Sequence, residues 1–202
     1  MQNIIHIHQN KELRFVKKCL LCYFFAPLCG AILLVLFIVS SGAKSFQISN
    51  LFSNQLAYIV LLSLFLCALG FIAGAIGFYR LSKITRHMSF FENFAFSFLA
   101  VILCAILSYL VPNASNTLSL IGNGVSLFYL HKLYRELSLY TQERFFLSGF
   151  RLLLFSFMLA LLGILVQALV IIFLTIAVVL MCVALGFLGR AFLNFSQVFL
   201  KA

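Results

Sequence analysis

An uncharged run in the last quarter of the chain decides its fold class. Residues 152–189 read LLLFSFMLALLGILVQALVIIFLTIAVVLMCVALGFLG and contain no charged side chain. One straight helix of that length would be about 57 Å long, whereas the hydrocarbon core of a bilayer is about 30 Å thick. The run therefore predicts two membrane-spanning helices, with the bend near residues 163–167.

The rest of the chain repeats this apolar character. Of its 202 residues, 64% are hydrophobic and only 9% are charged, against about a quarter in a soluble domain. Four more spans are predicted at about residues 19–41, 57–79, 94–111 and 116–130. Pro27 predicts a kink in the first, and Gly122, Asn123 and Gly124 interrupt the fourth. The predicted fold is all-α: a polytopic integral membrane helical bundle of about six transmembrane helices.

The basic residues are distributed asymmetrically between the two sides of such a bundle. With six spans, 13 of the 14 Lys and Arg residues fall on one side, and only Lys44 falls on the other. Basic residues in short loops favour the cytosolic side, so both termini are predicted to be cytosolic. A five-span alternative would place Arg190 and Lys201 outside. The chain divides into a basic N-terminus (1–18), a transmembrane domain (19–189) and a cytosolic tail (190–202).

Two of the basic segments resemble each other. LSKITRHMS at residues 81–89 is followed 49 residues later by LHKLYRELS at residues 130–138. In this register Lys83 and Arg86 recur as Lys132 and Arg135. Each segment predicts a short amphipathic helix that continues a span at the membrane surface. We interpret the chain as three helical hairpins in the same orientation, related as parallel internal repeats.

The same region resembles a known family. FYRLSKITRHMSFFENFAFSFLAVI (78–102) and LYRELSLYTQERFFLSGFRLLLF (133–155), with the apolar hairpin that follows, are similar to small multi-span membrane proteins grouped as domain of unknown function 996. The resemblance covers roughly residues 70–187 and excludes the first 50. It implies an integral membrane protein and no particular activity. Together with the absence of organelle signals, it predicts a bacterial cytoplasmic (inner) membrane location.

Three groups of residues are candidate sites. Lys83, Arg86, Lys132 and Arg135 can bind anionic lipid headgroups or an acidic membrane protein, or can simply set topology. Asn123 can line a substrate path in a broken helix, although hydrogen bonding between helices is the commoner use of such a residue. A small-residue face for helix packing, within the chain or between two copies, is formed by Gly70, Gly74 and Gly77.

Catalytic chemistry has little material in this sequence. The chain contains four Glu and no Asp, and it lacks a phosphate-binding loop of the P-loop type. Cys19 and Cys22 have a metal-binding spacing, with His6 and His8 upstream, but they begin an apolar span and are interpreted as structural. We therefore expect no catalytic residue, no metal, no cofactor and no nucleic-acid partner.

The functional prediction follows from where the polar residues lie. Recurring charges are on the surface loops, whereas the predicted spans contain almost nothing polar. This pattern favours a non-enzymatic accessory or scaffold protein with a basic cytosolic face. The alternative is a small-solute transporter or channel-like protein that is built on the parallel repeats and uses Asn123. Ion-coupled transport often uses buried carboxylates or histidines, and the predicted spans contain none. The oligomeric state is left open.

Overall fold

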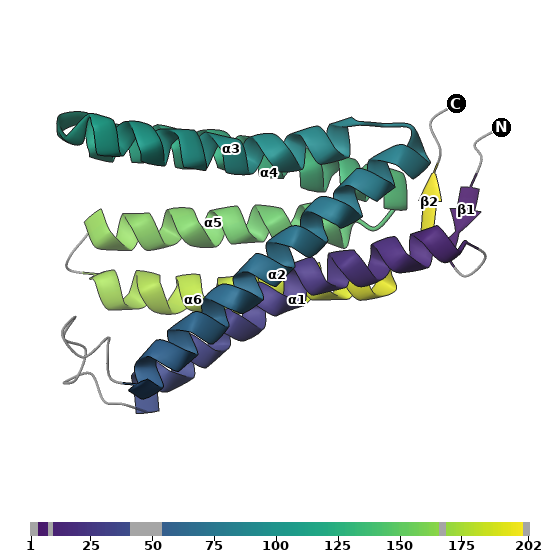
Figure 1. The fold of residues 1–202 in the computed structure, drawn as a ribbon. Helices are drawn as coiled ribbons and strands as arrows, with labels where there is room; N and C mark the ends of the chain where they lie inside the picture. The colour runs from purple at the N-terminus through teal and green to yellow at the C-terminus, as the bar shows by residue number, and fades with distance from the viewer. Residues whose placement is uncertain (1–3, 8–9, 41–53, 166–168, 200–202) are drawn as a thin grey trace.

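The computed structural model describes residues 4–7, 10–40, 54–165 and 169–199. Helices dominate these residues (Figure 1): α1 (Lys11–Ser40), α2 (Asn54–Thr85), α3 (Ser89–Leu110), α4 (Ser115–Thr141), α5 (Phe145–Leu165) and α6 (Val170–Asn194). A 3-10 turn, η4 (Pro112–Ala114), joins α3 to α4, and two short strands are β1 (Ile4–His6) and β2 (Gln197–Phe199). The predicted turn at Pro112 and the division of residues 152–189 into two helices are confirmed. Of the predicted bend at residues 163–167, the first three residues lie within α5, and the other two are outside the described residues.

The helices pack as three successive antiparallel hairpins, α1–α2, α3–α4 and α5–α6. In each hairpin one serine hydroxyl bridges the two helices by donating to a backbone carbonyl. The bonds are Ser63 to Gly30 at 3.0 Å, Ser108 to Ser115 at 3.3 Å, and Ser156 to Ala177 at 2.7 Å. Bonds of this kind hold helices together where lipid removes the hydrophobic driving force.

Five of the described helices contain stretches long and apolar enough to cross a membrane: Lys11–Phe37, Ala57–Thr85, Ser89–Leu110, Phe145–Gly163 and Val170–Asn194. The chain is therefore a multi-pass helical membrane protein. The helix α4 does not reach this hydropathy, although it is continuous through Gly122, Asn123 and Gly124. The predicted interruption of the fourth span is wrong, because its two glycines lie within regular helix.

Both ends of the described chain lie at one end of the bundle (Figure 1), together with the α2–α3 and α4–α5 turns. We call this the terminal end. Here β1 and β2 pair antiparallel, with Ile4 opposite Phe199 and His6 opposite Gln197. The purely all-α prediction is therefore incomplete by one two-stranded sheet. Residues 197–199 belong to this sheet, so the predicted tail is partly folded.

The helices also cross both of the predicted domain boundaries. One boundary, at residue 18, falls inside α1, which begins at Lys11, and the other, at residue 189, falls inside α6. As a 30-residue helix, α1 is about 45 Å long, some 15 Å more than the hydrocarbon core of a bilayer. The basic first turns of α1 are therefore continuous with its span.

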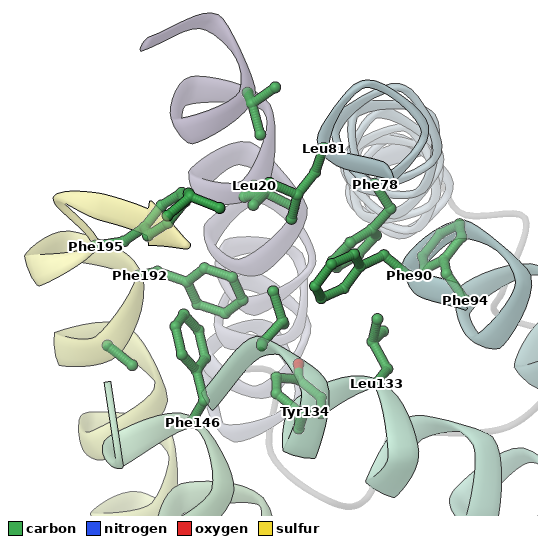
Figure 2. Close-up of a cluster of buried hydrophobic side chains, with 14 of the residues drawn as sticks. Leu20, Phe78, Leu81, Phe90, Phe94, Leu133, Tyr134, Phe146, Phe192 and Phe195 are labelled. Carbon is green, nitrogen blue, oxygen red and sulfur yellow. The ribbon is translucent and has the colours of Figure 1, made fainter. Parts of the chain in front are cut away.

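The main core lies toward the terminal end, where all six helices meet (Figure 2). Its largest buried side chains include Leu20, Phe78, Phe90, Leu133, Phe146 and Phe192, one from each helix. Away from it, large apolar side chains are exposed, as at Leu120 and Ile171. This division follows from solvent: burial stabilises a protein only where the alternative is water, and lipid tails are as apolar as leucine.

Candidate functional site

Charged side chains gather at the terminal end. Every Lys and Arg among the described residues lies in the helix turns nearest that end or in the connections there. The four candidate bases Lys83, Arg86, Lys132 and Arg135 are exposed. The hydrophobic core beneath them fixes the helices that carry them. This surface is the candidate functional site.

Lys83 lines a polar depression between the start of α1 and the end of α2. The depression has a volume of about 400 Å³, and Glu12, Tyr79 and Arg80 also line it. The Arg80 guanidinium lies 4.5 Å from the centre of the Phe15 ring, a cation–π distance. Two bases and one acid thus face a hollow that is large enough for a small anionic group.

Arg86 ends α2 in a left-handed turn. Its φ angle is +54°, and the amide of His87 donates to the carbonyl of Ser82 at 3.0 Å. These features define a Schellman motif, in which the left-handed position usually holds glycine. The backbone of this motif fixes Arg86 in the α2–α3 turn, where its side chain is exposed.

Lys132 and Arg135 lie on α4, inside a helix that continues to Thr141. Leu133, Tyr134 and Leu137 form the buried face of this segment, so the two bases project from the other side. Arg86 follows the end of its helix, whereas Arg135 precedes the end of its own by six residues. The two bases that the 49-residue register pairs therefore occupy different positions relative to the ends of their helices.

A polar network lies beside these bases, between the α2–α3 turn and α4. The Glu136 carboxylate accepts a hydrogen bond of 2.6 Å from the Ser89 hydroxyl and one of 3.1 Å from the Asn93 amide. The Ser89 hydroxyl also contacts Nδ1 of His87. Asn93 is buried, and the other three side chains are half-buried. The network ties α3 to α4 at the edge of the basic surface.

The order of groups in this network differs from a nucleophile relay. In a catalytic triad the histidine stands between the serine and the carboxylate, whereas here Ser89 stands between His87 and Glu136. The carboxylate therefore cannot orient the imidazole. This arrangement favours a structural role for the network. The sequence alone did not predict the network, because its members lie up to 49 positions apart.

Tyr140 packs against the network. Its ring centre lies 5.1 Å from that of His87 and 5.2 Å from that of Phe90. Burial, and secondarily the nearby Glu136 carboxylate, raise the pKa of the Tyr140 phenol above its usual 10.0, because both disfavour the phenolate. Tyr140 is thus a neutral phenol at physiological pH.

Asn123 lies away from the terminal end, on the hairpin α3–α4. It is exposed and lines a depression of about 310 Å³, together with Cys104, Ser108 and Ser119. The neighbouring Gly122 brings the helices together, since a Cβ there would be 2.6 Å from the Cys104 Cβ. The structure therefore places Asn123 beside one hairpin rather than between hairpins.

The three glycines of α2 face α1. A Cβ at Gly70 would lie 2.6 Å from the Pro27 ring, one at Gly74 2.6 Å from the Tyr23 ring, and one at Gly77 3.1 Å from Leu20. In this structure the small-residue face is occupied by the chain's own first helix.

The cysteines are dispersed over the helices. Cys19 and Cys22 are free thiols on α1, and among the described residues no three His, Cys, Asp or Glu side chains form a metal-binding group. His6 lies in β1, whereas His8 is outside the described residues.

Comparisons with protein-family models, with curated proteins and with solved structures find no match to the chain. The class of protein is therefore defined by its fold alone, as a multi-pass helical membrane protein with a basic terminal end. The resemblance to domain of unknown function 996 stays a prediction.

Proposed function

We propose that the chain crosses the membrane six times, with both termini in the cytosol. Support comes from the β1–β2 pairing, which requires both ends of the described chain on one side and hence an even number of crossings. In this proposal α4, the fourth helix along the chain, also crosses the membrane despite its low hydropathy. It runs antiparallel to α3, which supplies its hydrogen-bonding and packing partners. The concentration of bases at the terminal end favours the cytosolic orientation.

In the cell, we propose, this protein is a non-enzymatic accessory or scaffold whose basic surface binds an acidic partner. One observation carries the proposal: the bases are exposed over a core built by all six helices, so the fold presents them on a firm support. By contrast, the serines that bridge the hairpins are engaged with backbone carbonyls. Polar groups spent on packing are not free to handle a substrate.

The expected partner is an anionic lipid headgroup or an acidic segment of another membrane protein. Lys83 and Arg80 face the depression of about 400 Å³, and Arg86, Lys132 and Arg135 are exposed on the same end. Each base near an anionic surface contributes about 1 kcal/mol. The proposed location is a bacterial cytoplasmic membrane.

The test is a co-purification from native membranes in mild detergent. Wild type is compared with a variant in which Lys83, Arg86, Lys132 and Arg135 are all Gln. A matched control replaces four other exposed bases by Gln: Lys11, Arg14, Lys18 and Arg144. We expect a partner or anionic lipid to be lost from the first variant and retained by the control. Equal recovery from all three proteins would refute the binding surface.

Orientation is checked in the same variants, because removing bases can invert a membrane protein. Reporter domains fused to either end must both be active in the cytosol for a result to count. A reporter active outside would overturn the six-span topology independently of partner binding.

Transport through the bundle has weaker support. Asn123 lies beside the single hairpin α3–α4, whereas the alternative requires it to line a path between the repeats. If the alternative held, Asn123→Leu would abolish solute flux in liposomes, whereas a scaffold would tolerate this change.

A further inference from the structure

A third cavity lies between the three hairpins, on the far side of the main core from the termini. Its volume is about 480 Å³, within the range of about 300–1,000 Å³ for small-molecule sites. All six helices line it, through residues such as Tyr23 (α1), Phe71 (α2), Phe98 (α3), Tyr134 (α4), Leu153 (α5) and Leu185 (α6). A site made by every helix depends on the whole fold.

The lining is almost entirely hydrocarbon and aromatic. Pro27, Leu28 and Leu188 complete much of the wall. The few polar groups in the wall include the hydroxyls of Tyr23 and Tyr134, which interact with each other. Because this lining offers little to a polar ligand, its occupant is expected to be apolar as well.

The depth of the cavity identifies the solvent that can reach it. Tyr23 lies five residues beyond Lys18 on α1, and Cys67 lies thirteen residues before Arg80 on α2. At 1.5 Å per residue, these positions are about 7 Å and about 20 Å from the nearest bases. The cavity thus lies within the hydrocarbon layer and reaches past its middle, where the surrounding molecules are lipid chains.

Volume excludes a bulkier occupant. A helix with its side chains is about 10–12 Å wide, so 480 Å³ holds only about one of its turns. A single flexible hydrocarbon chain is narrow enough to enter between hairpins and long enough to fill the space. We infer that this cavity is a binding site for one acyl chain of a membrane lipid.

The chain contains no Trp, which makes a single introduced Trp a specific reporter. Phe98→Trp places it in the cavity wall. The matched control is Phe96→Trp, two residues away on α3, where the wild-type side chain is 48% exposed and does not line the cavity. Both proteins are purified in digitonin, a detergent without an alkyl chain, and titrated with phosphatidylcholine brominated on its acyl chains.

Saturable quenching of Phe98→Trp is expected at about one lipid per protein. Phe96→Trp should show weak quenching without saturation, with a half-maximal lipid concentration at least about tenfold higher, a difference of about 1.4 kcal/mol. Identical titrations of the two proteins would overturn the inference, because the bound chain would then be ordinary surrounding lipid.

Filling the cavity provides the second arm. Leu185→Phe, added to Phe98→Trp, should abolish saturable quenching, whereas Val183→Phe on the exposed face of the same helix should leave it unchanged. Quenching that persists after filling would contradict the site.

Native mass spectrometry gives a readout that needs no Trp. Wild type and Val183→Phe should retain a lipid that Leu185→Phe loses, and the retained mass distinguishes a phospholipid from a free fatty acid. A retained protein or peptide, or no retained lipid in wild type, would refute the acyl-chain site. This result is independent of the basic surface, because none of its residues lines the cavity.

Discussion

Thr85 and Thr141 end α2 and α4 in the same way. Each hydroxyl donates to the carbonyl four residues earlier, Thr85 to Leu81 at 2.8 Å and Thr141 to Leu137 at 2.6 Å. The next residue in both cases has a left-handed backbone, with φ of +54° at Arg86 and +57° at Gln142. Leu-Ser-x-x-Thr precedes both turns, so the two junctions correspond at a spacing of 56 residues.

Buried aromatic positions follow the same spacing. Phe78, before the first turn, corresponds to Tyr134, before the second. After the turns, Phe90 corresponds to Phe146 and Phe94 to Phe150. All six side chains are buried. A hairpin repeat in this register preserves core positions, whereas the 49-residue register paired exposed bases. We propose the 56-residue register for the parallel repeats.

The left-handed residues give the first prediction. Non-glycine side chains pay a steric cost in this conformation that glycine avoids. We therefore expect Arg86→Gly and Gln142→Gly each to stabilise the fold by about 0.5–1 kcal/mol, measured as a rise in thermal midpoint in detergent. Arg86→Val should lower it. A fall with both glycine variants would show that the turns relax in solution.

Close packing of α2 on α1 gives the second prediction. A methyl group at Gly70 would lie 2.6 Å from Cδ and 2.7 Å from Cγ of Pro27, so Gly70→Ala should destabilise the protein by about 1–3 kcal/mol. Gly124→Ala is the matched control, because no atom lies within 4 Å of the added Cβ. The control should be neutral or stabilising by up to about 1 kcal/mol. Equal midpoints for the two variants would contradict the packing.

Lys17 gives the third prediction, at the junction of the chain ends. Its Nζ donates to the carbonyls of Leu193 at 2.6 Å and Phe195 at 2.7 Å, which caps the C-terminal end of α6. Lys17→Met should cost about 1–2 kcal/mol and should speed proteolysis after α6. Lys18→Met, on an exposed neighbour, should change neither measurement. Unchanged proteolysis of the Lys17 variant would show that β1 and β2 alone retain the end.

The carboxylate of Glu136 gives the fourth prediction. Glu136→Gln replaces charge-assisted hydrogen bonds from Ser89 and Asn93 by neutral ones, at a cost of about 1–2 kcal/mol. The control is Glu92→Gln. Glu92 is exposed and lies on α3 between Ser89 and Asn93, so its replacement should change the stability little. Thermal unfolding of the two variants in one detergent decides between them. A larger loss in Glu92→Gln would place the stabilising carboxylate elsewhere.

Tyr140 gives a prediction about pH. Burial and Glu136 raise the pKa of its phenol above 10.0, so the folded protein holds this proton more tightly than the unfolded chain does. The associated stability is complete below about pH 10 and is lost as pH rises through the folded-state pKa. The difference in phenolate absorbance between wild type and Tyr140→Phe should therefore rise at a pH above 10.0, the usual pKa of a tyrosine phenol. In Glu136→Gln the midpoint should move down, and an unmoved midpoint would leave burial as the whole cause.

Local sequence reasoning found the features that depend on neighbouring residues. Pro112 predicted the α3–α4 turn, and the apolar run 152–189 predicted its own division, which occurs between Leu165 and Val170. Gly122 and Gly124 wrongly predicted an interruption, because the hydrogen bonds of the helix, and at Gly122 the packing against Cys104 of α3, outweigh the cost of two glycines.

The network around Glu136 was outside the reach of that reasoning. His87 and Ser89 are near each other in the chain, but the carboxylate comes from the next hairpin helix. Only the packing of α3 on α4 decides which polar side chains meet. Leu-Ser-x-x-Thr recurs in the sequence at a spacing of 56 residues. The similar spacing of the bases instead favoured the 49-residue register.

By itself, the sequence determined that this is a helical membrane protein with its bases gathered at one end. Hydropathy and charge act locally and add along about 20 residues, so they can be read without a fold. Tertiary structure alone decided that Ile4 pairs with Phe199, that all six helices share one core, and that an apolar cavity remains between the hairpins. These features need contacts between distant segments, which three-residue strands and uniformly apolar helices do not encode in their own patterns.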